Sequence, residues 1–449
     1  MSAARDVARR VLARVADGQA YATLALDGEL GRAGLDERDR RLVAELVYGT
    51  LRQEARLDRA LAAFADLGRT PPAVRRALRM AAYQLLHLRV PAHAAVDDAV
   101  GAVRAQGGGK LAGFANAVLR KLAARGEPAL PTEPRARAEV VGSLPRWIVD
   151  ELAAQLPAEE LEAAATALAQ PAALWLRVNP TRATRDEVAA ELTAAGATVT
   201  TSPLAPHALA VRGLGEPTAS PGFVAGRWTV QDLAAQLVGA VAAPAADARV
   251  LDACAGVGGK TTHLAELAWA AAGAGTTADP GPAPRTIDAV DPAATKLGHL
   301  RTTAARLGLS GIRTIVGTLE RAAVEAAYDL VVVDAPCSGL GVVRRHPEAK
   351  ARVTAASVAG LAAAQAALLD QAAARVAPGG VLIYAVCTFT RAEGPDQLAA
   401  FVARHPAFTV EPPPLPAEVA AAVVEGGAVR TWPHRHDADG FFLARLRRR

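Results

Sequence analysis

The chain has 449 residues, which is enough for several domains with hydrophobic cores of their own, and a formal net charge of +5 at pH 7. Its three cysteines, at positions 254, 337 and 387, contain no Cys-x-x-Cys pair, and this spacing argues against a disulfide framework and a structural zinc site. No stretch approaches the roughly 18 uncharged apolar residues of a membrane span, and the N-terminus lacks the apolar run of a secretory signal. We therefore expect a cytoplasmic protein that binds neither a metal nor a membrane.

The first 125 residues have helical patterns and hardly any strand signal. They hold 21 Lys and Arg against 13 Asp and Glu, a net charge of +8, so the remainder of the chain is near −3. A basic helical domain of this kind indicates a polyanionic partner such as nucleic acid, although codon bias alone also produces an Arg- and Ala-rich composition. Apolar residues recur at i, i+3, i+4 and i+7 in Asp6–Val15, Leu42–Leu51, Arg56–Phe64, Ala73–Leu88, His93–Val103 and Leu111–Ala124.

A stretch rich in Pro, Glu and Arg, Gly126–Arg137, follows this domain and is typical of a linker. The next region, to about residue 230, combines helices and strands and predicts a small α+β module. Its expected elements are a helix over Arg146–Leu156, a strand over Leu174–Val178 closed by Asn179-Pro180, a helix over Arg185–Ala195 and strand-like pieces toward Trp228. The predicted division is a helical domain (1–125), a linker (126–144), an α+β module (145–230) and a catalytic domain (231–449).

From residue 231 onward, strand and helix patterns alternate, which predicts a doubly wound parallel sheet of the Rossmann-like type. The expected strands are Arg249–Asp252, Thr286–Asp291, Arg313–Val316, Asp329–Asp334 and Gly380–Tyr384. The expected helices are Thr261–Ala268, Ala293–Leu307 and Ser357–Val376. An Ala-, Gly-, Pro- and Thr-rich tract, Ala270–Arg285, is predicted to be a disordered surface insertion.

The first turn of this sheet, Asp252–Thr261, is rich in glycine and leads into a helix N-terminus, an arrangement that offers free N–H groups to a ligand. Asp291, at the end of the next strand, is suited to accept hydrogen bonds from ribose hydroxyls. The turn lacks the spacing of a phosphate-binding loop, because only Val257 and Gly258 separate Gly256 from Gly259. We therefore predict a nucleoside cofactor rather than a nucleoside triphosphate.

Two cysteines follow strands of the predicted sheet directly, Cys337 after Leu330–Val333 and Cys387 after Val381–Tyr384. Open α/β sheets place their chemistry at the carboxyl ends of the strands. A thiol can add to an electron-poor ring carbon and leave again, so two thiols could divide attack and release. The alternative is that both are small core residues, since free cysteine is often buried. Their equivalent positions at two strand ends favour function.

The chain resembles the RNA cytosine-C5 methyltransferases of the NOL1/NOP2/Sun type, and its first 125 residues, with Ala115–Arg120, resemble the NusB RNA-binding fold. That pairing is similar to bacterial 16S rRNA cytosine methyltransferases. The small module would then be RRM-like. The resemblance rests on Cys-Ala-x-x-Gly-Gly-Lys at 254–260, Val290-Asp291, Asp-Ala-Pro-Cys-Ser-Gly at 334–339 and Tyr-Ala-Val-Cys at 384–387, with Gln231-Asp232, Arg344–Glu348 and Asp439–Phe442 as further matches.

This resemblance implies S-adenosylmethionine as cofactor and assigns roles to four residues. Cys387 would add to C6 of cytosine, Cys337 would assist release, and Asp334 and Lys260 would hydrogen-bond the base. In DNA cytosine methyltransferases a Pro-Cys motif carries the nucleophile, which would nominate Cys337, but the family resemblance favours Cys387. The implied cofactor-binding residues are Cys254, Ala255, Gly256, Val257, Gly258, Gly259, Lys260, Asp291, Thr318 and Asp334.

The sequence departs from the family at four positions. Val257 stands where Pro is usual, Val386 where Thr is common, Thr388 where Ser is common, and Thr318 where the family tends to place an Asp that contacts the adenosine end of the cofactor. A hydroxyl at Thr318 cannot supply the negative charge of that Asp.

RNA contacts are expected from two basic segments. Arg177 and Asn179 would face RNA from the small module, and Arg344 and Arg345 from a basic loop, although a strand end with a turn and a solvated rim are the plainer explanations. We expect a monomer that acts on 16S rRNA, naked or in an assembling small subunit. A tRNA substrate and a non-catalytic RNA-binding assembly factor are alternatives, and retention of both cysteines with Asp334 and Lys260 argues against the second.

Overall fold

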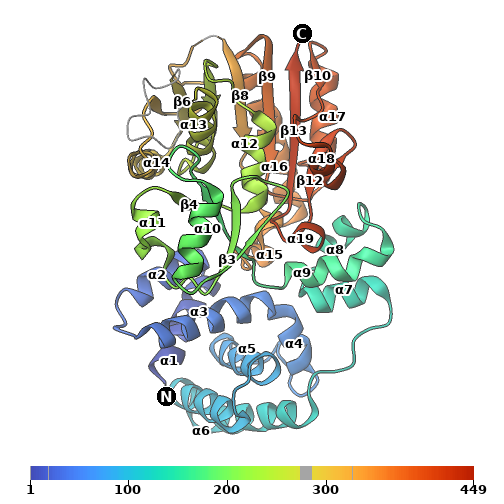
Figure 1. Cartoon of the computed structure of the whole chain (residues 1–449). Coiled ribbons are helices and arrows are strands. Elements are labelled where there is room, and N and C mark those ends of the chain that lie inside the picture. The colour runs from blue at the N-terminus through green and yellow to red at the C-terminus, as the bar shows by residue number, and fades with distance from the viewer. Residues whose placement is uncertain (1, 19, 274–285, 326) are drawn as a thin grey trace. The chain divides into compact units, whose positions relative to one another are not determined.

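The computed structural model describes residues 2–18, 20–273, 286–325 and 327–449. The chain forms two compact units (Figure 1). Unit 1 runs to Pro171 and also contains Val343–Val353, and unit 2 contains Ala172–Val342 and Thr354–Arg449. No helix among the described residues is long and apolar enough to span a membrane.

Unit 1 is built from helices in its described part, as the sequence predicts. Their apolar faces bury Leu46, Leu57, Leu78 and Met80 in one core. The helices are α1 (Ala3–Ala16), α2 (Ala22–Leu30), α3 (Glu37–Arg52), α4 (Glu54–Ala62), α5 (Pro72–His87), α6 (Ala92–Arg125), α7 (Pro134–Gly142), α8 (Arg146–Ala153), the 3₁₀ turn η1 (Ala158–Glu160), α9 (Leu161–Leu168) and α15 (Ala349–Arg352).

Three details of unit 1 differ from the sequence-based expectation or sharpen it. Helix α2 was not predicted, because its buried face relies on the small residues Ala22 and Ala25, which give a weak apolar pattern. Helix α6 is interrupted at Gly108, whose φ of 77° separates the two predicted helical segments. The stretch Gly126–Arg137, expected to be a linker, enters α7 at Pro134, where Glu133 caps the helix by accepting hydrogen bonds from two backbone N–H groups.

The segment Val343–Val353 joins unit 1 through side chains that bond to backbone groups. Lys350 Nζ donates to the carbonyl oxygens of Arg52 (2.6 Å) and Gly142 (3.4 Å). Arg352 donates to the carbonyl oxygens of Val15 and Ala20, and Glu348 Oε1 accepts from Ala22 N at 3.0 Å. A stretch that is distant in sequence thereby satisfies backbone groups at the ends of α1, α2, α3 and α7.

Unit 2 begins with a small antiparallel sheet in the order β2-β3-β1-β4. Its strands are β1 (Leu174–Val178), β2 (Thr198–Thr201), β3 (Ala208–Arg212) and β4 (Trp228–Val230), with η2 (Pro217–Ala219) and the helices α10 (Arg185–Ala194) and α11 (Pro221–Val224). Trp228, Leu176 and Leu209 form its core. Helix α10 starts with a capping box, in which Thr184 and Glu187 satisfy each other's backbone N–H groups.

A larger sheet follows, in the order β11-β12-β13-β9-β8-β5-β6-β7, with β10 paired to β13. The strands β9, β8, β5, β6 and β7 run parallel, as predicted, but β10 to β13 run antiparallel, so the sheet is mixed. The strands are β5 (Val250–Asp252), β6 (Ile287–Asp291), β7 (Ile312–Val316), β8 (Tyr328–Asp334), β9 (Val376–Val386), β10 (Phe408–Val410), β11 (Val424–Glu425), β12 (Ala428–Thr431) and β13 (Phe441–Arg448).

Helices cover both faces of this sheet, and alternate strand residues enter two separate cores. Leu330 and Val332 pack in the core that includes α12, α13 and α14, while Val331 and Val333 pack in the core that includes α16 and α17. The helical elements are α12 (Leu233–Ala242), α13 (Gly259–Ala271), α14 (Ala294–Leu307), η3 (Leu340–Val342), α16 (Ala355–Ala373), α17 (Pro395–Arg404), α18 (Ala417–Val423) and α19 (Pro433–His436). Most of the predicted insertion, 274–285, lies outside the described residues.

The carboxyl ends of the parallel strands meet at one edge of the sheet. Strand order reverses between β5 and β8, because the chain moves from β5 to β6 and β7 on one side and then returns to β8 on the other. This reversal is a topological switch point, where open α/β sheets bind their ligands.

The buried lysine in unit 1 gives a testable pH dependence. Burial lowers the pKa of Lys350 from 10.5 to about 7. Below about pH 7 this lysine is charged in both the folded and the unfolded chain, and between pH 7 and 10.5 the unfolded chain binds more protons, so the free energy of unfolding rises with pH by at most about 1.4 kcal/mol per unit. Lys350→Met is expected to flatten this rise in urea unfolding followed by circular dichroism, whereas Lys110→Met, at an exposed site, should keep it. Equal slopes in both variants would contradict the assignment.

Candidate active site

The loop after β5 brings Lys260 to the switch point. Its backbone needs glycine at position 258, where φ is 87° and an added Cβ would lie 2.4 Å from Leu300 Cγ. The helix α13 begins at Gly259, so Lys260 stands in its first turn. Lys260 Nζ lies 2.5 Å from Asp334 Oδ2, at the end of β8, and 5.6 Å from the centre of the Phe441 ring.

The Lys260–Asp334 ion pair fixes the protonation state of the lysine. Burial by itself lowers the pKa of Lys260, but the charge and the hydrogen bond of Asp334 outweigh burial and raise the pKa above its ordinary value. Lys260 is therefore an ammonium group at neutral pH, and it can donate hydrogen bonds but cannot accept a proton.

The two cysteines after β8 and β9 face each other. Cys337 Sγ lies 3.3 Å from Cys387 Sγ, and both side chains are half-buried. The hydrogen bond with Cys387, followed by burial, raises the pKa of Cys337 well above its ordinary value. Cys337 therefore keeps its proton at neutral pH and can donate it in a hydrogen bond to the sulfur of Cys387.

A buried carboxylate that the sequence analysis missed ties the two cysteine loops together. Glu393 has no exposed surface. Its Oε1 accepts from Ser338 N (2.8 Å) and Gln365 Nε2 (3.0 Å), and its Oε2 accepts from Ser338 Oγ (2.6 Å) and Thr390 Oγ1 (2.8 Å). Ser338 follows Cys337 directly and Thr388, which follows Cys387, lies 2.8 Å from Ser338 Oγ. The only sequence signal was a single acid six residues after Cys387.

The C-terminal Asp439–Phe442 segment closes the same region from β13. Gly440 N donates to Gly341 O at 2.9 Å, and Gly341 N donates to Cys387 O at 3.0 Å. A Cβ on Gly341 would stand 1.8 Å from Gly440 O, so the two backbones can approach this closely only with glycine at position 341. Asp232 Oδ1 accepts from Asp439 N at 3.1 Å, which connects the predicted Gln231-Asp232 motif to this segment.

The expected nucleoside-binding residues lie along the carboxyl ends of β5, β6, β7 and β8. Asp291, at the end of β6, accepts from Gly256 N (3.0 Å) and Ala293 N (2.8 Å) and so shapes the glycine loop. Val257 and Thr318 are exposed, whereas Ala255 and Gly258 are buried. Burial raises the pKa of Cys254, which makes this third cysteine a packing residue in the loop.

A second carboxylate under this loop was also missed as a site residue. Asp252 is fully buried at the end of β5 and accepts from Thr261 Oγ1 at 2.6 Å and from Cys254 N at 3.3 Å. Burial raises its pKa to about 6. Because both its bonds run to the loop and to α13, Asp252 holds the first turn of that helix beside Lys260.

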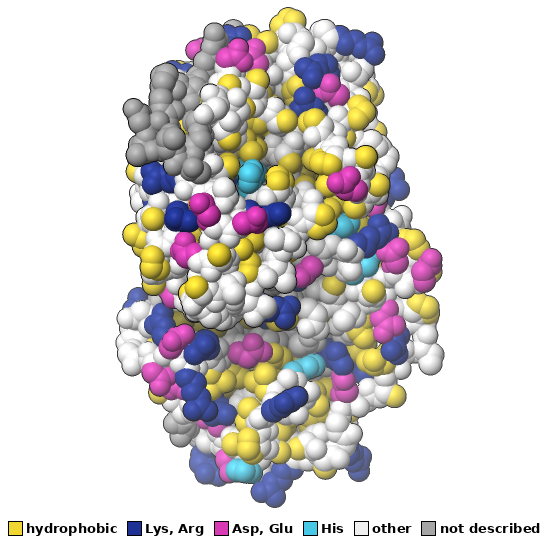
Figure 2. Space-filling view, viewed as in Figure 1, with side chains coloured by type: hydrophobic (Ala, Val, Ile, Leu, Met, Phe, Trp, Pro, Cys, Tyr) yellow, Lys and Arg dark blue, Asp and Glu magenta, His cyan; other side chains and the backbone are white. Residues whose placement is uncertain are grey.

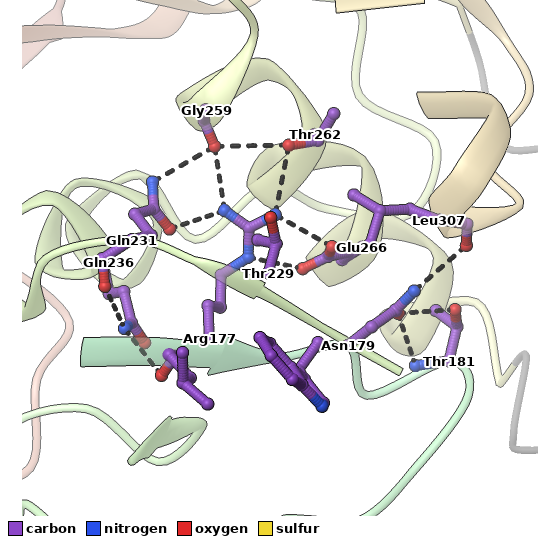
Figure 3. Close-up of polar contacts among 12 residues, drawn as sticks. Arg177, Asn179, Thr181, Thr229, Gln231, Gln236, Gly259, Thr262, Glu266 and Leu307 are labelled. Atoms are coloured by element: carbon purple, nitrogen blue, oxygen red, sulfur yellow. Dashed lines mark hydrogen bonds and ion pairs between the residues drawn. The ribbon is translucent and has the colours of Figure 1, made fainter. Parts of the chain in front are cut away.

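Arg177 and Asn179, expected to contact RNA, have no exposed surface and are instead buried supports. Figure 3 shows their polar contacts. Arg177 extends from β1 and donates to both carboxylate oxygens of Glu266 (2.8 and 2.9 Å) and to the carbonyl oxygen of Gly259 (2.9 Å). Asn179 Nδ2 donates to the carbonyl oxygens of Gly226 and Leu307 at 3.1 Å each. These bonds fasten the small sheet to α13 and α14, so the two side chains are not available to RNA.

The basic loop is likewise less exposed than expected. Arg344 is 4% exposed, and its guanidinium donates to Pro171 O at 3.2 Å within unit 1. Arg345 is half-buried and His346 is exposed. Burial therefore removes Arg344 from the surface that RNA can reach.

The comparisons with known proteins agree with this architecture. A model of the family described as 16S rRNA methyltransferase RsmB/F matches residues 240–447, a NusB family model matches residues 2–124, and a model of the ferredoxin-like domain of RsmF/B-like methyltransferases matches residues 144–215. The probable ribosomal RNA small subunit methyltransferase B of Synechocystis sp. is 34% identical and the alignment covers 100% of both chains. Ribosomal RNA small subunit methyltransferase B of Xylella fastidiosa is 35% identical, with 98% of this chain and 99% of that chain covered.

Solved structures share the fold. The crystal structure of PH0851 has a TM-score of 0.80 at 24% identity and covers 99% of each chain. NSun6 from Pyrococcus horikoshii with SFG has a TM-score of 0.55 at 19% identity, and the match covers 71% of this chain and 98% of that chain. Full-length identity of this degree to rRNA methyltransferases makes the protein an RNA methyltransferase. The chain belongs to the RsmB/F family, in which a NusB domain and a ferredoxin-like domain precede a Rossmann-like catalytic domain.

The carboxylate of Glu393 is expected to be essential for the placement of the cysteines. In Glu393→Gln one acceptor oxygen becomes an NH₂ group, which either opposes the donors Ser338 N and Gln365 Nε2 or forces the hydroxyls of Ser338 and Thr390 to accept instead of donate, and so rearranges their other bonds. Because small displacements of reacting groups are costly, we expect the methylation rate to fall about 10- to 100-fold. Glu418→Gln, at an exposed position, is the matched control and should leave the rate unchanged. An active, normally folded Glu393→Gln enzyme would contradict this role.

Breaking the buried Arg177–Glu266 pair is expected to destabilise unit 2. Arg177→Met leaves the Glu266 carboxylate buried without its partner, so urea unfolding should show a loss of about 3–5 kcal/mol. The double variant Arg177→Met, Glu266→Leu removes both charges and should recover much of this loss. A single variant within about 1 kcal/mol of the parent would mean that the pair contributes little.

Proposed function

We propose that this enzyme methylates C5 of a cytosine in 16S rRNA, with Cys387 as the nucleophile and Cys337 as the residue that assists release. The observation that carries the proposal is the pair of sulfur atoms 3.3 Å apart, beside the Lys260–Asp334 ion pair at the switch point of the sheet. The choice of 16S rRNA is supported by relatives that are named ribosomal RNA small subunit methyltransferases B.

The residues of the site fit S-adenosylmethionine. Gly256 and Gly258 hold a loop with positive φ angles beside Asp291, whose carboxylate oxygens have lone pairs left for ribose hydroxyls. Val257, in this loop, and Thr318, after β7, have exposed side chains, and Thr318 offers a neutral hydroxyl. The cofactor would be held by Cys254–Lys260, Asp291, Thr318 and Asp334, and when bound it supplies an electrophilic methyl group.

The protein side chains would activate the base. Cytosine C5 is a poor nucleophile, and addition of the Cys387 thiolate to C6 makes C5 enamine-like. Lys260, as an ammonium group, donates a hydrogen bond to the ring, and Asp334 accepts one from the base. Cys337 retains its proton while Cys387 attacks, because its pKa is raised.

Release requires two bond changes after the methyl group has been transferred. The C5 proton is removed, and the electron pair of that bond forms the C5–C6 double bond as the Cys387 sulfur leaves C6. Cys337 is suited to both proton transfers: its thiol would give its proton to the Cys387 sulfur as that sulfur leaves C6, and the resulting Cys337 thiolate, a strong base because its pKa is high, would take the C5 proton. The 3.3 Å separation of the sulfurs supports this role, because a Cys387–C6 bond would form next to Cys337.

The test uses purified full-length enzyme, methyl-labelled S-adenosylmethionine and three substrates: naked 16S rRNA, small ribosomal subunits and tRNA. Mass spectrometry of the nucleosides should detect 5-methylcytosine in 16S rRNA and none with Cys387→Ala. Cys337→Ala should accumulate a covalent RNA–protein adduct that survives denaturing gel electrophoresis.

Each alternative has its own outcome in this test. Methylation of tRNA alone would replace the substrate but keep the reaction. An active Cys387→Ala enzyme together with an inactive Cys337→Ala enzyme that forms no adduct would make Cys337 the nucleophile. Binding of rRNA without any methylation would favour the assembly factor.

A further inference from the structure

Unit 1 contains a cavity of about 400 Å³ that the proposed reaction does not use. Residues of α1, α3 and α5 line it, together with residues of the Val343–Val353 segment. One wall is apolar and is made by Leu12, Val15 and Leu51. The volume falls within the range of small-molecule sites, which is about 300–1,000 Å³.

The charge of the cavity is positive. Four arginines and two glutamates line it, a net of +2. Arg79 is committed to Asp58 and Glu54, and Arg352 donates to two carbonyl oxygens. Arg75 and Arg76, both half-buried, have neither a hydrogen bond nor an ion pair to any part of the chain that the structure describes. Two arginines that line one cavity without a carboxylate partner are suited to a phosphate.

Two buried polar atoms of residues that line the cavity also lack a partner among the described residues. Glu348 is 4% exposed, and although its Oε1 accepts from Ala22 N, its Oε2 has no hydrogen bond within the described residues. Thr50 Oγ1 is also buried and has no hydrogen bond within the described residues. A buried acceptor without a donor is costly, by roughly 1–3 kcal/mol, so an occupant that brings N–H groups would be favoured here. One cavity therefore holds a carboxylate oxygen that lacks a donor, two arginines that lack an anion, and apolar residues between neighbouring helices.

A nucleotide meets all three requirements. Its phosphate matches Arg75 and Arg76, its planar base matches the apolar wall, and an exocyclic amino group such as N4 of cytosine donates to a carboxylate. We propose that this cavity is a nucleotide-binding site that selects an amino-bearing base through Glu348. The same chemistry is offered by a free mononucleotide and by one nucleotide of an RNA strand, and only the second rests on the proposed function.

The site ties ligand binding to the Val343–Val353 segment. Glu348 comes from this segment, whereas Arg75 and Arg76 come from α5. A ligand that contacts both would add a link between them, beside the bonds that Lys350 and Arg352 already make.

The test measures binding of cytidine, guanosine and uridine monophosphates and of inorganic phosphate to the full-length protein by isothermal titration calorimetry, without S-adenosylmethionine. Cytidine or guanosine monophosphate should bind more tightly than uridine monophosphate and phosphate. Arg75→Gln with Arg76→Gln should weaken binding at least about 10-fold, because two charge-assisted contacts are lost. Arg38→Gln with Arg69→Gln, which removes the same charge from exposed positions, is the control and should leave affinity within about twofold.

A second variant tests the base contact separately. Glu348→Gln keeps an oxygen for Ala22 N and presents an NH₂ group, so preference should shift from cytidine toward uridine monophosphate, whose O4 accepts. A packing defect alone would lower the affinity for all nucleotides equally. An unchanged preference, or no saturable binding of any nucleotide, would overturn the proposal and leave a solvent-filled cavity.

Competition by a short cytosine-containing RNA distinguishes the sources. Displacement of the mononucleotide by RNA at lower concentration supports an RNA nucleotide as the natural occupant, and absence of displacement supports a free nucleotide. Because no methyl transfer is measured, failure of the cavity to bind leaves the proposed reaction intact, and failure of methylation leaves the binding result intact.

Discussion

The arrangement of the two cysteine loops depends on one buried carboxylate. Glu393 accepts four hydrogen bonds from the residues around the two cysteine loops. One loop follows β8 and the other follows β9. A loop is usually the mobile part of a sheet edge. Here the bonds of Glu393 hold Ser338, the residue after Cys337, in place. Ser338 Oγ in turn contacts Thr388 Oγ1, and Thr388 is the residue after Cys387. The 3.3 Å distance between the sulfurs follows from this arrangement.

The second constraint is the attachment of the small sheet to α13, the helix that follows the glycine loop. Arg177 and Glu266 are both without exposed surface, and a buried ion pair is favourable only when its remaining donors and acceptors are satisfied. Gln231, Thr262 and the carbonyl oxygen of Gly259 supply those partners. Because Gly259 precedes Lys260, the ferredoxin-like domain supports the residue that pairs with Asp334. This domain therefore supports the loop that carries Lys260 through buried bonds.

The helical unit carries most of the positive charge, but on the face drawn in Figure 2 its Lys and Arg side chains are interspersed with Asp and Glu. Several of these arginines are bonded to acids of neighbouring helices, as Arg9 is to Asp98 and Arg79 to Asp58. Net charge therefore overstates the free positive potential. Arginines that remain without acids, such as Arg75 and Arg76, are the better guide to where an anion binds.

Local features of the sequence determined the class of fold and are the basis of the chemistry proposed for the site. Amphipathic periodicity predicted most helices of unit 1, and apolar runs followed by glycine or cysteine predicted the parallel strands, because both signals depend on neighbours in sequence. The same runs predicted which residues stand at the carboxyl edge, among them Lys260, Asp334, Cys337 and Cys387. The sequence also indicated the NusB and methyltransferase domains by resemblance.

Only the tertiary structure decided which polar residues are supports and which are accessible. Arg177 in a strand followed by Asn179-Pro180 has the sequence signature of a surface residue, yet it pairs with Glu266, 89 residues away. Glu393 meets Ser338 across 55 residues, and the antiparallel strands β10 to β13 extend the sheet through long-range pairing. The physical reason is the same in each case: burial and pairing of a polar side chain depend on contacts between distant segments, and no local pattern encodes them.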